Sequence, residues 1–272
     1  MVWVAGIDVG ASYTKVVIAD DEGHVASRAM VRTGFRLDEA AYEAFSLALE
    51  EAGLQREDVS YIVSTGNGRA QVSFRDAHCT DLTACAYGAW FFYPETRTVL
   101  DVGGQSMKAI KLSEDGRVLG FRLNDKCAAG TGAFLEKTAY YMGYDIQELG
   151  ELATTSTNPV TISSVCAVFA EAEVINHVTA GVAPADIMQG AILSLVDRSI
   201  QLLKRVGLVP QVTVSGGIMR FTSMRKVLEE KLGLQVNFLP DGAVQFTTAL
   251  GAAMLGHRRL QRLGLGARRL AS

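Results

Sequence analysis

AGIDVGASYTKVV, residues 5–17, is the stretch that decides the fold, because its pattern returns 93 residues later as TVLDVGGQSMKAI, residues 98–110. Each copy reads as an apolar strand, a turn that opens on Asp-Val-Gly, and a second strand. Two such copies predict two lobes built on one plan, each offering a β-hairpin to a shared cleft. The positions identical in both copies are Asp8 and Asp101, Val9 and Val102, Gly10 and Gly103, and Lys15 and Lys108.

The turn of each hairpin is made of small residues, which can surround a phosphate with backbone N–H groups. One Asp-x-Gly turn would be weak evidence, since many hairpins without a ligand carry one. Two turns in register, each after an apolar strand, predict binding of a nucleotide's phosphates. A Gly-Gly pair, Gly216 and Gly217, would let the backbone approach a planar ring or a ribose. A tight turn without a ligand would explain that pair equally well.

Strands and helices alternate along the rest of the chain, which is typical of an α/β fold. We expect strands over residues 3–9, 16–20, 24–31, 59–64, 117–123, 211–214 and 234–239. Helices are expected over residues 37–52, 82–92, 146–153, 185–206, 219–232 and 243–263. A glycine turn, TGNGR at residues 65–69, follows the strand 59–64. The last helix carries small residues that permit close packing: Ala249, Gly251, Ala252, Ala253 and Gly256.

Composition and charge narrow the class of protein. The 272 residues are 49% hydrophobic and 20% charged, which indicates an ordinary soluble globular protein. A net charge of -3 gives no reason to expect nucleic acid or acidic lipid as a partner. The longest uncharged stretch, residues 152–170, is rich in Thr, Ser and Asn and contains Pro159, so we expect no membrane span. The N-terminus lacks the basic segment of a signal peptide, and we expect a cytoplasmic protein.

Four cysteines, Cys79, Cys85, Cys127 and Cys166, suit a reducing compartment better than a disulfide framework. They form no C-x-x-C pair, which argues against a thioredoxin-type or structural zinc site. Cys79 and Cys85 are interpreted as structural. Cys127 and Cys166 each precede an apolar run with helical periodicity, so we expect each sulfur at the N-terminus of a helix, the first helix ending near Gly143.

A helix N-terminus favours a thiolate over a thiol and stabilises an anionic cluster, because unpaired amide N–H groups and the positive end of the helix dipole lie there. Two thiolates cannot complete a metal site that takes four ligands. A symmetric dimer would supply the other two and place one iron-sulfur cluster on its two-fold axis. The alternative is that Cys127 and Cys166 are buried as small hydrophobic side chains.

Taken together, four motifs resemble the actin, hexokinase and heat-shock-ATPase superfamily: GIDVG at 6–10, LDVGGQ at 100–105, VSGG at 214–217 and ALGAA at 249–253. Within it, NDKCAAGTG at 124–132 and ISSVCAVFAE at 162–171 closely resemble the BadF/BadG/BcrA/BcrD type. That branch comprises ATP-dependent activators of 2-hydroxyacyl-CoA dehydratases and ATP-hydrolysing subunits of benzoyl-CoA reductase. The resemblance implies an α/β, duplicated ribonuclease-H-like fold with two lobes around a nucleotide cleft. Lobe I would be residues 1–94 plus 244–272, and lobe II residues 95–243.

The resemblance also implies ligands and site residues. One [4Fe-4S] cluster would be held by Cys127 and Cys166 of each of two chains, in a homodimer or a heterodimer with a homologous subunit. ATP or ADP would bind with Mg, which Asp8 and Asp101 would hold. The catalytic residues would be Asp8, Asp101, Lys15 and Gln105. The residues implied to contact the nucleotide are Gly10, Ala11, Ser12, Tyr13, Thr14 and Lys15 in the first phosphate loop, Gly103, Gly104 and Gln105 in the second, Gly130, Thr131 and Gly132 before the cluster helix, Gly216, Gly217 and Ile218 in the adenosine loop, and Gln245. Residues 11–13 and 241–248 depart from the pattern of the branch.

The implied function is ATP hydrolysis coupled to electron transfer. The protein would pass a low-potential electron to an iron-sulfur dehydratase or reductase component, and a ferredoxin or flavodoxin would reload it. One alternative is a sugar or carboxylate kinase of the same superfamily, including the N-acetylglucosamine kinase type. A length of 272 residues leaves little room for the insertions that build a kinase's substrate pocket. Another alternative is a nucleotide-dependent binding module without enzymatic activity.

Overall fold

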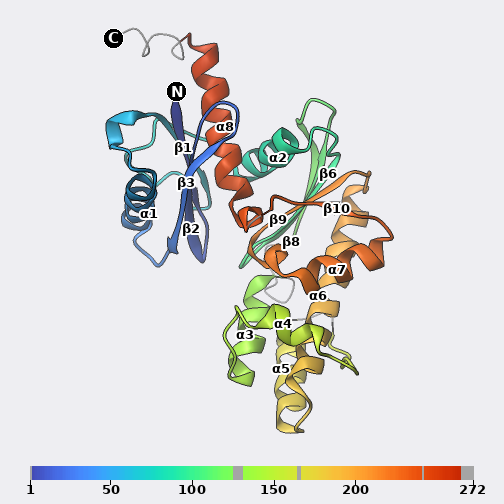
Figure 1. Cartoon of the computed structure of the whole chain (residues 1–272). Coiled ribbons are helices and arrows are strands. Elements are labelled where there is room, and N and C mark those ends of the chain that lie inside the picture. Colours follow the sequence, from blue (N-terminus) through green and yellow to red (C-terminus); the bar gives the residue numbers. More distant parts are fainter. Residues whose placement is uncertain (1, 125–130, 164–166, 241, 265–272) are drawn as a thin grey trace. The chain divides into compact units, whose positions relative to one another are not determined.

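The chain forms two compact units in a computed structural model, which describes residues 2–124, 131–163, 167–240 and 242–264 (Figure 1). Unit 1 comprises Met1–Thr96, Leu112–Val118 and Leu239–Ser272, and unit 2 comprises Arg97–Lys111 and Leu119–Phe238. Each unit is built on a five-stranded mixed sheet. No helix among the described residues is both long and apolar enough to cross a membrane.

The sheet of unit 1 has the strand order β3-β2-β1-β4-β5. Strand β1 lies at its centre, antiparallel to β2 and parallel to β4. Because both faces of β1 are covered, its sequence WVAGIDV is apolar almost throughout rather than alternating. The strands are β1 (Trp3–Val9), β2 (Tyr13–Ala19), β3 (Val25–Arg32), β4 (Val59–Gly66) and β5 (Ala77–His78).

Helices cover both faces of this sheet, as Figure 1 shows for α1 and α8. Helix α1 (Leu37–Ala52) packs on the face that carries Ala5 and Ile7. Helix α8 (Thr247–Arg262) packs on the opposite face, which carries Val4 and Val17, and α2 (Asp81–Phe92) packs beside it. The alternation of side chains along β1 therefore divides the core of unit 1 into two layers.

Small residues bring α8 unusually close to its neighbours. A Cβ atom added to Gly6 of β1 would lie 1.8 Å from the Ala249 carbonyl oxygen. A Cβ atom on Gly251 would lie 1.9 Å from the Ala84 carbonyl oxygen of α2, and one on Gly88 would lie 2.3 Å from the Thr247 carbonyl oxygen. Backbone thus meets backbone at these contacts, which explains the run of small residues in the last helix.

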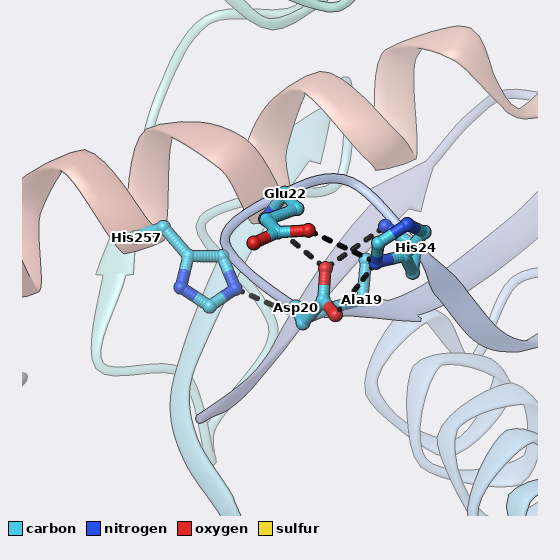
Figure 2. Close-up of polar contacts among 5 residues, drawn as sticks. All are labelled: Ala19, Asp20, Glu22, His24 and His257. Atoms are coloured by element: carbon cyan, nitrogen blue, oxygen red, sulfur yellow. Dashed lines mark hydrogen bonds and ion pairs between the residues drawn. The ribbon is translucent and has the colours of Figure 1, made fainter. Parts of the chain in front are cut away.

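The end of strand β2 is tied to α8 by a buried histidine. His257 of α8 places its Nε2 atom 2.9 Å from the Ala19 carbonyl oxygen (Figure 2). The next residue, Asp20, accepts hydrogen bonds from the backbone amides of Glu22 and His24 and closes the turn into β3. The His24 Nδ1 atom lies 3.1 Å from the Asp20 carboxylate (Figure 2). These contacts fix the β2–β3 turn against the helix.

Unit 2 repeats the plan of unit 1. Its strand order is β10-β9-β6-β7-β8. As in unit 1, the first two strands of the unit, β6 and β7, form an antiparallel hairpin, and two later strands, β9 and β10, run parallel to β6. This similarity confirms the duplicated α/β fold predicted from the repeat. The strands are β6 (Thr98–Val102), β7 (Met107–Leu112), β8 (Val118–Asn124), β9 (Val212–Ser215) and β10 (Val236–Asn237).

The helices of unit 2 gather around its longest helix, α6, which contacts α3, α4, α5 and α7. Helix α6 buries one stripe of apolar side chains, including Ile187, Ala191 and Leu195. The helices are α3 (Gly132–Met142), α4 (Leu149–Thr154), α5 (Ala167–Thr179), α6 (Pro184–Val206) and α7 (Thr222–Leu232).

Several boundaries differ from the expected ones. The helix expected over 219–232 is a 3-10 helix, Gly217–Arg220, followed by α7, because Phe221 takes an extended conformation between them. The helix expected over 243–263 is likewise a 3-10 helix, Ala243–Phe246, followed by α8. The strand expected over 234–239 pairs only at Val236–Asn237. Helix α3 begins at Gly132, five residues after Cys127.

Candidate functional site

The predicted first phosphate loop joins β1 to β2 in unit 1. Asp8 pairs with Lys15 across the two strands, and both side chains are half-buried. The Gly10 amide donates to the Tyr13 carbonyl oxygen at 3.2 Å, and a Cβ atom on Gly10 would lie 2.8 Å from that oxygen. The turn therefore closes only around a glycine. Thr14, the second residue of β2, is fully buried.

The glycine turn at residues 65–69 lies against this loop, because β4 runs parallel to β1 and ends beside it. Gly66 has a φ of +86°, and a Cβ atom there would lie 2.6 Å from Asp8 Oδ1. The Gly68 amide donates to the Val9 carbonyl oxygen at 3.0 Å. No role was predicted for this turn from the sequence. The signal that could have found it is a pair of glycines at the end of a strand adjacent to β1.

The second phosphate loop joins β6 to β7 with the register of the first. Asp101 pairs with Lys108, and the Gly103 amide donates to the Ser106 carbonyl oxygen at 2.8 Å. The Lys108 Nζ atom lies 3.1 Å from Asp101 Oδ2, with side chains 12% and 8% exposed. Lys108 was missed as a site residue, although its identity with Lys15 in the repeat was a signal for it. Gln105 is exposed on the same loop.

The N-terminus of helix α3 is bonded to the second phosphate loop. The Gly132 amide donates to the Gly103 carbonyl oxygen at 2.9 Å, and the Ala133 amide donates to the Gly104 carbonyl oxygen at 2.8 Å. Thr131, which precedes the helix, is fully buried. The two hydrogen bonds join the helix that follows Cys127 directly to a predicted nucleotide loop.

The Gly-Gly pair lies at the same edge of the sheet in unit 2. Strand β9 runs parallel to β6 with Asp101 opposite Ser215, so both strands end there. Gly216 has a φ of +101°, and a Cβ atom on it would lie 2.1 Å from the Val102 carbonyl oxygen. A Cβ atom on Gly132 would contact Ile218 at 2.9 Å. The structure thus brings the second loop, the start of α3 and the Gly-Gly loop together at the carboxyl ends of parallel strands, where ligands bind in open α/β sheets.

A small pocket of about 270 Å³ opens beside the Gly-Gly loop. Helix α4 supplies one wall, and the residues that follow the Gly-Gly pair supply the other. The Arg220 guanidinium lies 4.7 Å from the centre of the Phe221 ring at this wall. The lining residues are Gln147, Gly150, Glu151, Thr154, Arg220, Phe221 and Thr222. Both polar and apolar side chains therefore line this pocket.

The structure does not test the predicted roles of the cluster cysteines, Gly130 and Gln245. Cys127, Cys166 and Gly130 lie outside the described residues, although α5 begins at Ala167, directly after Cys166. Gln245 lies in the 3-10 helix Ala243–Phe246 of unit 1, and the structure does not test its predicted contact with adenine. Among the described residues, no cluster of three or more His, Cys, Asp or Glu side chains is arranged to hold a metal ion.

The two described cysteines are both shielded from solvent. Cys85 is buried in α2, and Cys79 is half-buried after β5. Burial raises the pKa of the Cys79 thiol to about 11. The thiol is therefore protonated near neutral pH, which makes it a poor nucleophile and a poor metal ligand.

Residues 5–256, almost the whole chain, match the model of one protein family. The chain belongs to the BadF/BadG/BcrA/BcrD ATPase family. The family's similarity extends through both phosphate loops, the start of α3 and the Gly-Gly loop, because all of them fall within the matched residues.

Two curated relatives show the range of proteins similar to this family member. It is 37% identical over 259 residues to the (R)-2-hydroxyglutaryl-CoA dehydratase activating ATPase of Acidaminococcus fermentans, covering 95% of this chain and 98% of the relative. It is also 37% identical over 280 residues to one of the subunits of benzoyl-CoA reductase from Thauera aromatica, covering 97% of each chain. The comparison therefore does not separate the dehydratase-activator branch from the reductase branch.

Solved structures agree with the assignment to the family. The activator of the 2-hydroxyisocaproyl-CoA dehydratase from Clostridium difficile with bound ADPNP matches with a TM-score of 0.91 and 34% identity, covering 99% of this chain and 100% of the other. A ROK family glucokinase from Streptomyces griseus matches with a TM-score of 0.60 and 13% identity, covering 94% and 99%. The second likeness shows the fold alone, which is the α/β, actin- and hexokinase-like fold predicted from the sequence.

Proposed function

We propose that this family member hydrolyses ATP to drive a low-potential electron into a partner, either a 2-hydroxyacyl-CoA dehydratase or a benzoyl-CoA reductase component. The observation that carries the proposal is the pair of hydrogen bonds from the Gly132 and Ala133 amides to the second phosphate loop. Helix α3 follows Cys127 along the chain, so this loop and a predicted cluster ligand are joined through one short segment. The names of the dehydratase-activator and reductase relatives support the same function.

Each phosphate loop offers donor groups of the kind that Mg-ATP requires. Asp8 and Asp101 offer carboxylate oxygens, the ligands that Mg prefers, and would hold it largely through water. When bound, Mg neutralises charge on the phosphates. Lys15 and the backbone N–H groups of the loops stabilise charge on the γ-phosphate, and Gln105 orients the attacking water. The pocket beside Arg220 would hold the base, with Gly216 and Gly217 close to the ribose.

Hydrolysis exchanges one bond at the γ-phosphorus for another. The oxygen of a water molecule forms a bond to this phosphorus, while the bond from the phosphorus to the bridging oxygen breaks. ADP leaves with the bridging oxygen, and the released inorganic phosphate carries the oxygen and both protons of the water. The loops that contacted the γ-phosphate then lose that contact. Because the start of α3 is bonded to the second loop, we propose that this loss is passed on to the helix that follows Cys127 in the sequence.

Thiolates of Cys127 and Cys166 from two chains make the donor set that a [4Fe-4S] cluster requires, and such a cluster supplies one-electron transfer. A reduced ferredoxin or flavodoxin is the electron donor, and an iron-sulfur centre of the partner enzyme is the acceptor. Moving an electron uphill costs roughly 2.3 kcal/mol per 100 mV. A gap of several hundred millivolts therefore needs on the order of 10 kcal/mol, which the hydrolysis of ATP can supply.

A dimer is supported by the surface next to Cys166. Val168 and Phe169, in the first turn of α5, are 72% and 66% exposed. Two large apolar side chains at the start of a helix favour burial against another protein surface. Since each chain offers only Cys127 and Cys166 to the cluster, a second chain is the partner that completes four ligands. The proposal includes both a homodimer and a heterodimer with a homologous subunit.

The test is an oxygen-free preparation of the pure protein. We expect about four irons per dimer and a visible absorption band that dithionite bleaches. Both should vanish in Cys127→Ser and in Cys166→Ser, whereas Cys79→Ser should keep them as the matched control. A preparation that contains no iron and still activates its partner enzyme would refute the proposal.

A further inference from the structure

We propose that Arg69 is a further catalytic residue, a cation that contacts the γ-phosphate beside the first phosphate loop. The inference rests on the proposed ATP hydrolysis and assigns a role to the glycine turn at residues 65–69. It concerns unit 1 alone, where Asp8, the turn and Arg69 are all placed by the same sheet.

The backbone places this turn at the site. Because β1 and β4 are parallel, with Asp8 opposite Thr65 and Val9 opposite Gly66, both strands end at the same edge. The Gly68 amide bonds to the Val9 carbonyl oxygen, and a Cβ atom on Gly68 would lie 2.5 Å from the Val9 side chain. The turn is therefore packed against the residue that opens the first phosphate loop, and any other side chain at Gly68 would push it away.

Arg69 is held in this turn by one hydrogen bond of its side chain and one of its backbone. Its Nη1 atom donates to the Gly66 carbonyl oxygen at 3.0 Å, and its own carbonyl oxygen accepts from the Ser64 hydroxyl at 2.8 Å. The residue is half-buried, and it makes no ion pair with any residue that the structure describes. An arginine has five N–H groups, so one hydrogen bond to a carbonyl leaves further donors for a phosphate.

The charges around Cys79 support the closeness of Arg69 to Asp8. The Arg69 guanidinium lowers the pKa of this half-buried thiol, and the Asp8 carboxylate raises it, although burial is the larger effect. Both charged groups therefore lie near the same sulfur. A guanidinium near the Mg-binding carboxylate is positioned to meet the phosphate that this metal would hold.

A cation at this position would stabilise the negative charge that develops during ATP hydrolysis. Negative charge grows on the bridging oxygen as the bond to the γ-phosphorus breaks, and a fixed arginine stabilises that charge without reorganisation. The planar guanidinium can contact two phosphate oxygens at once, whereas the Lys15 ammonium acts as a point charge. Arg69 would thus act mainly in the transition state and contribute little to the binding of ADP.

The chain provides a matched control. Arg75 lies six residues later, is also half-buried and also donates from Nη1 to the carbonyl oxygen three residues before it, that of Val72. Arg69→Met and Arg75→Met therefore remove the same local hydrogen bond. They differ in whether the lost cation lies beside Asp8.

The experiment measures steady-state ATP hydrolysis, the Kd of ADP and the Kd of ADP with fluoroaluminate, on the full-length anaerobic protein. In Arg69→Met we expect hydrolysis to fall about 10²–10³-fold, with a similar loss of fluoroaluminate-complex affinity. The Kd of ADP should change by less than about threefold, since the ground state keeps its contacts. Arg75→Met should match the wild type in all three measurements.

A second measurement separates catalysis from folding. Arg69→Ala should recover part of its hydrolysis when guanidinium ions are added at low concentration, and Arg75→Ala should not respond. The inference is overturned if Arg69→Met hydrolyses ATP within about threefold of the wild type, if ADP and its fluoroaluminate complex weaken equally, or if guanidinium gives no recovery. A protein that lacks iron but shows the Arg69 effect would refute the electron-transfer function and leave this inference standing.

Discussion

At the scale of single residues, the β1–β2 and β6–β7 hairpins carry the same aspartate and lysine, but these charges are paired differently. In unit 2, Asp101 and Lys108 form a nearly buried ion pair, whereas Asp8 and Lys15 of unit 1 are both half-buried. A nucleotide-bound metal would therefore compete with Lys108 for the Asp101 carboxylate. The sequence predicted the position of each charge from the repeat. It could not predict the pairing, because this depends on burial and side-chain conformation.

His257 makes the stability of unit 1 depend on pH. Burial lowers the pKa of its imidazole below the ordinary value of about 6.5, against the opposing effects of its hydrogen bond to Ala19 and the charges of Asp21 and Asp20. The unfolded chain therefore binds this proton more readily than the folded one. The stabilisation by neutral His257 is complete above about pH 6.5 and is lost as the pH falls below it.

We expect the free energy of unfolding to decrease below pH 6.5 by at most about 1.4 kcal/mol per pH unit from this group. Urea titrations between pH 5 and 8 would measure it. His257→Gln keeps a donor for the Ala19 carbonyl oxygen and should show a weaker dependence. Asp20 is the other buried group nearby; burial alone would raise its pKa, but hydrogen bonds from His24 and Glu22 lower it, so its contribution is lost only at more acidic pH. Equal pH dependence in the wild type and in His257→Gln would contradict the prediction.

At the scale of single elements, the hydrophobic pattern predicted a helix correctly where a nearby residue of the sequence ends it. Helix α1 runs over Leu37–Ala52 as expected, because Gly53 ends it in a left-handed conformation. The expected helix over 219–232 is interrupted instead, because Gly216 packs against Val102 and the chain leaves this contact through a 3-10 turn. That contact belongs to a neighbouring strand, so the pattern around residue 219 does not reveal it.

The crossing of α2 and α8 gives a prediction about stability. Gly251→Ala places a methyl group 1.9 Å from the Ala84 carbonyl oxygen, so one of the helices must shift. Because the packing is strained, we expect the free energy of unfolding to fall by about 1–3 kcal/mol and the Tm to fall by a few degrees. Thermal and urea unfolding would measure it, with Gly120→Ala as the control, since a Cβ atom at Gly120 meets nothing within 4 Å. If the two variants were equally stable, the close approach of the helices would be wrong.

The sequence predicted which loops form the candidate site, but it did not predict which of their residues lie close together. The motif resemblance identified both phosphate loops and the Gly-Gly loop, and the structure brings the second loop, Gly132 and Gly216 together. The roles of these residues remain predictions. Arg69 was missed because its proximity to Asp8 arises from the parallel pairing of β1 with β4, which the sequence does not specify.

At the scale of the whole molecule, we propose that a second chain completes the iron-sulfur cluster. We expect Phe169→Glu to shift the anaerobic protein from dimer toward monomer and to lower its iron content, because a charge would replace an apolar contact next to Cys166. Light scattering after size-exclusion chromatography measures the shift. Phe35→Glu is the matched control, since Phe35 is 87% exposed but lies in unit 1. A stable dimer in Phe169→Glu would place the contact between the two chains elsewhere.

The packing of α8 on β1 has a consequence for the way the protein is made. The first four strands have left the ribosome long before the helix that covers them, since about 180 residues separate Gly66 from Thr247. At roughly 5–20 residues per second, the nascent sheet waits on the order of 10–40 s with an apolar face open to water. Such a delay makes the growing polypeptide a natural client for chaperones that bind exposed apolar segments. Synthesis of α8, rather than of the first strands, would complete the packing of unit 1.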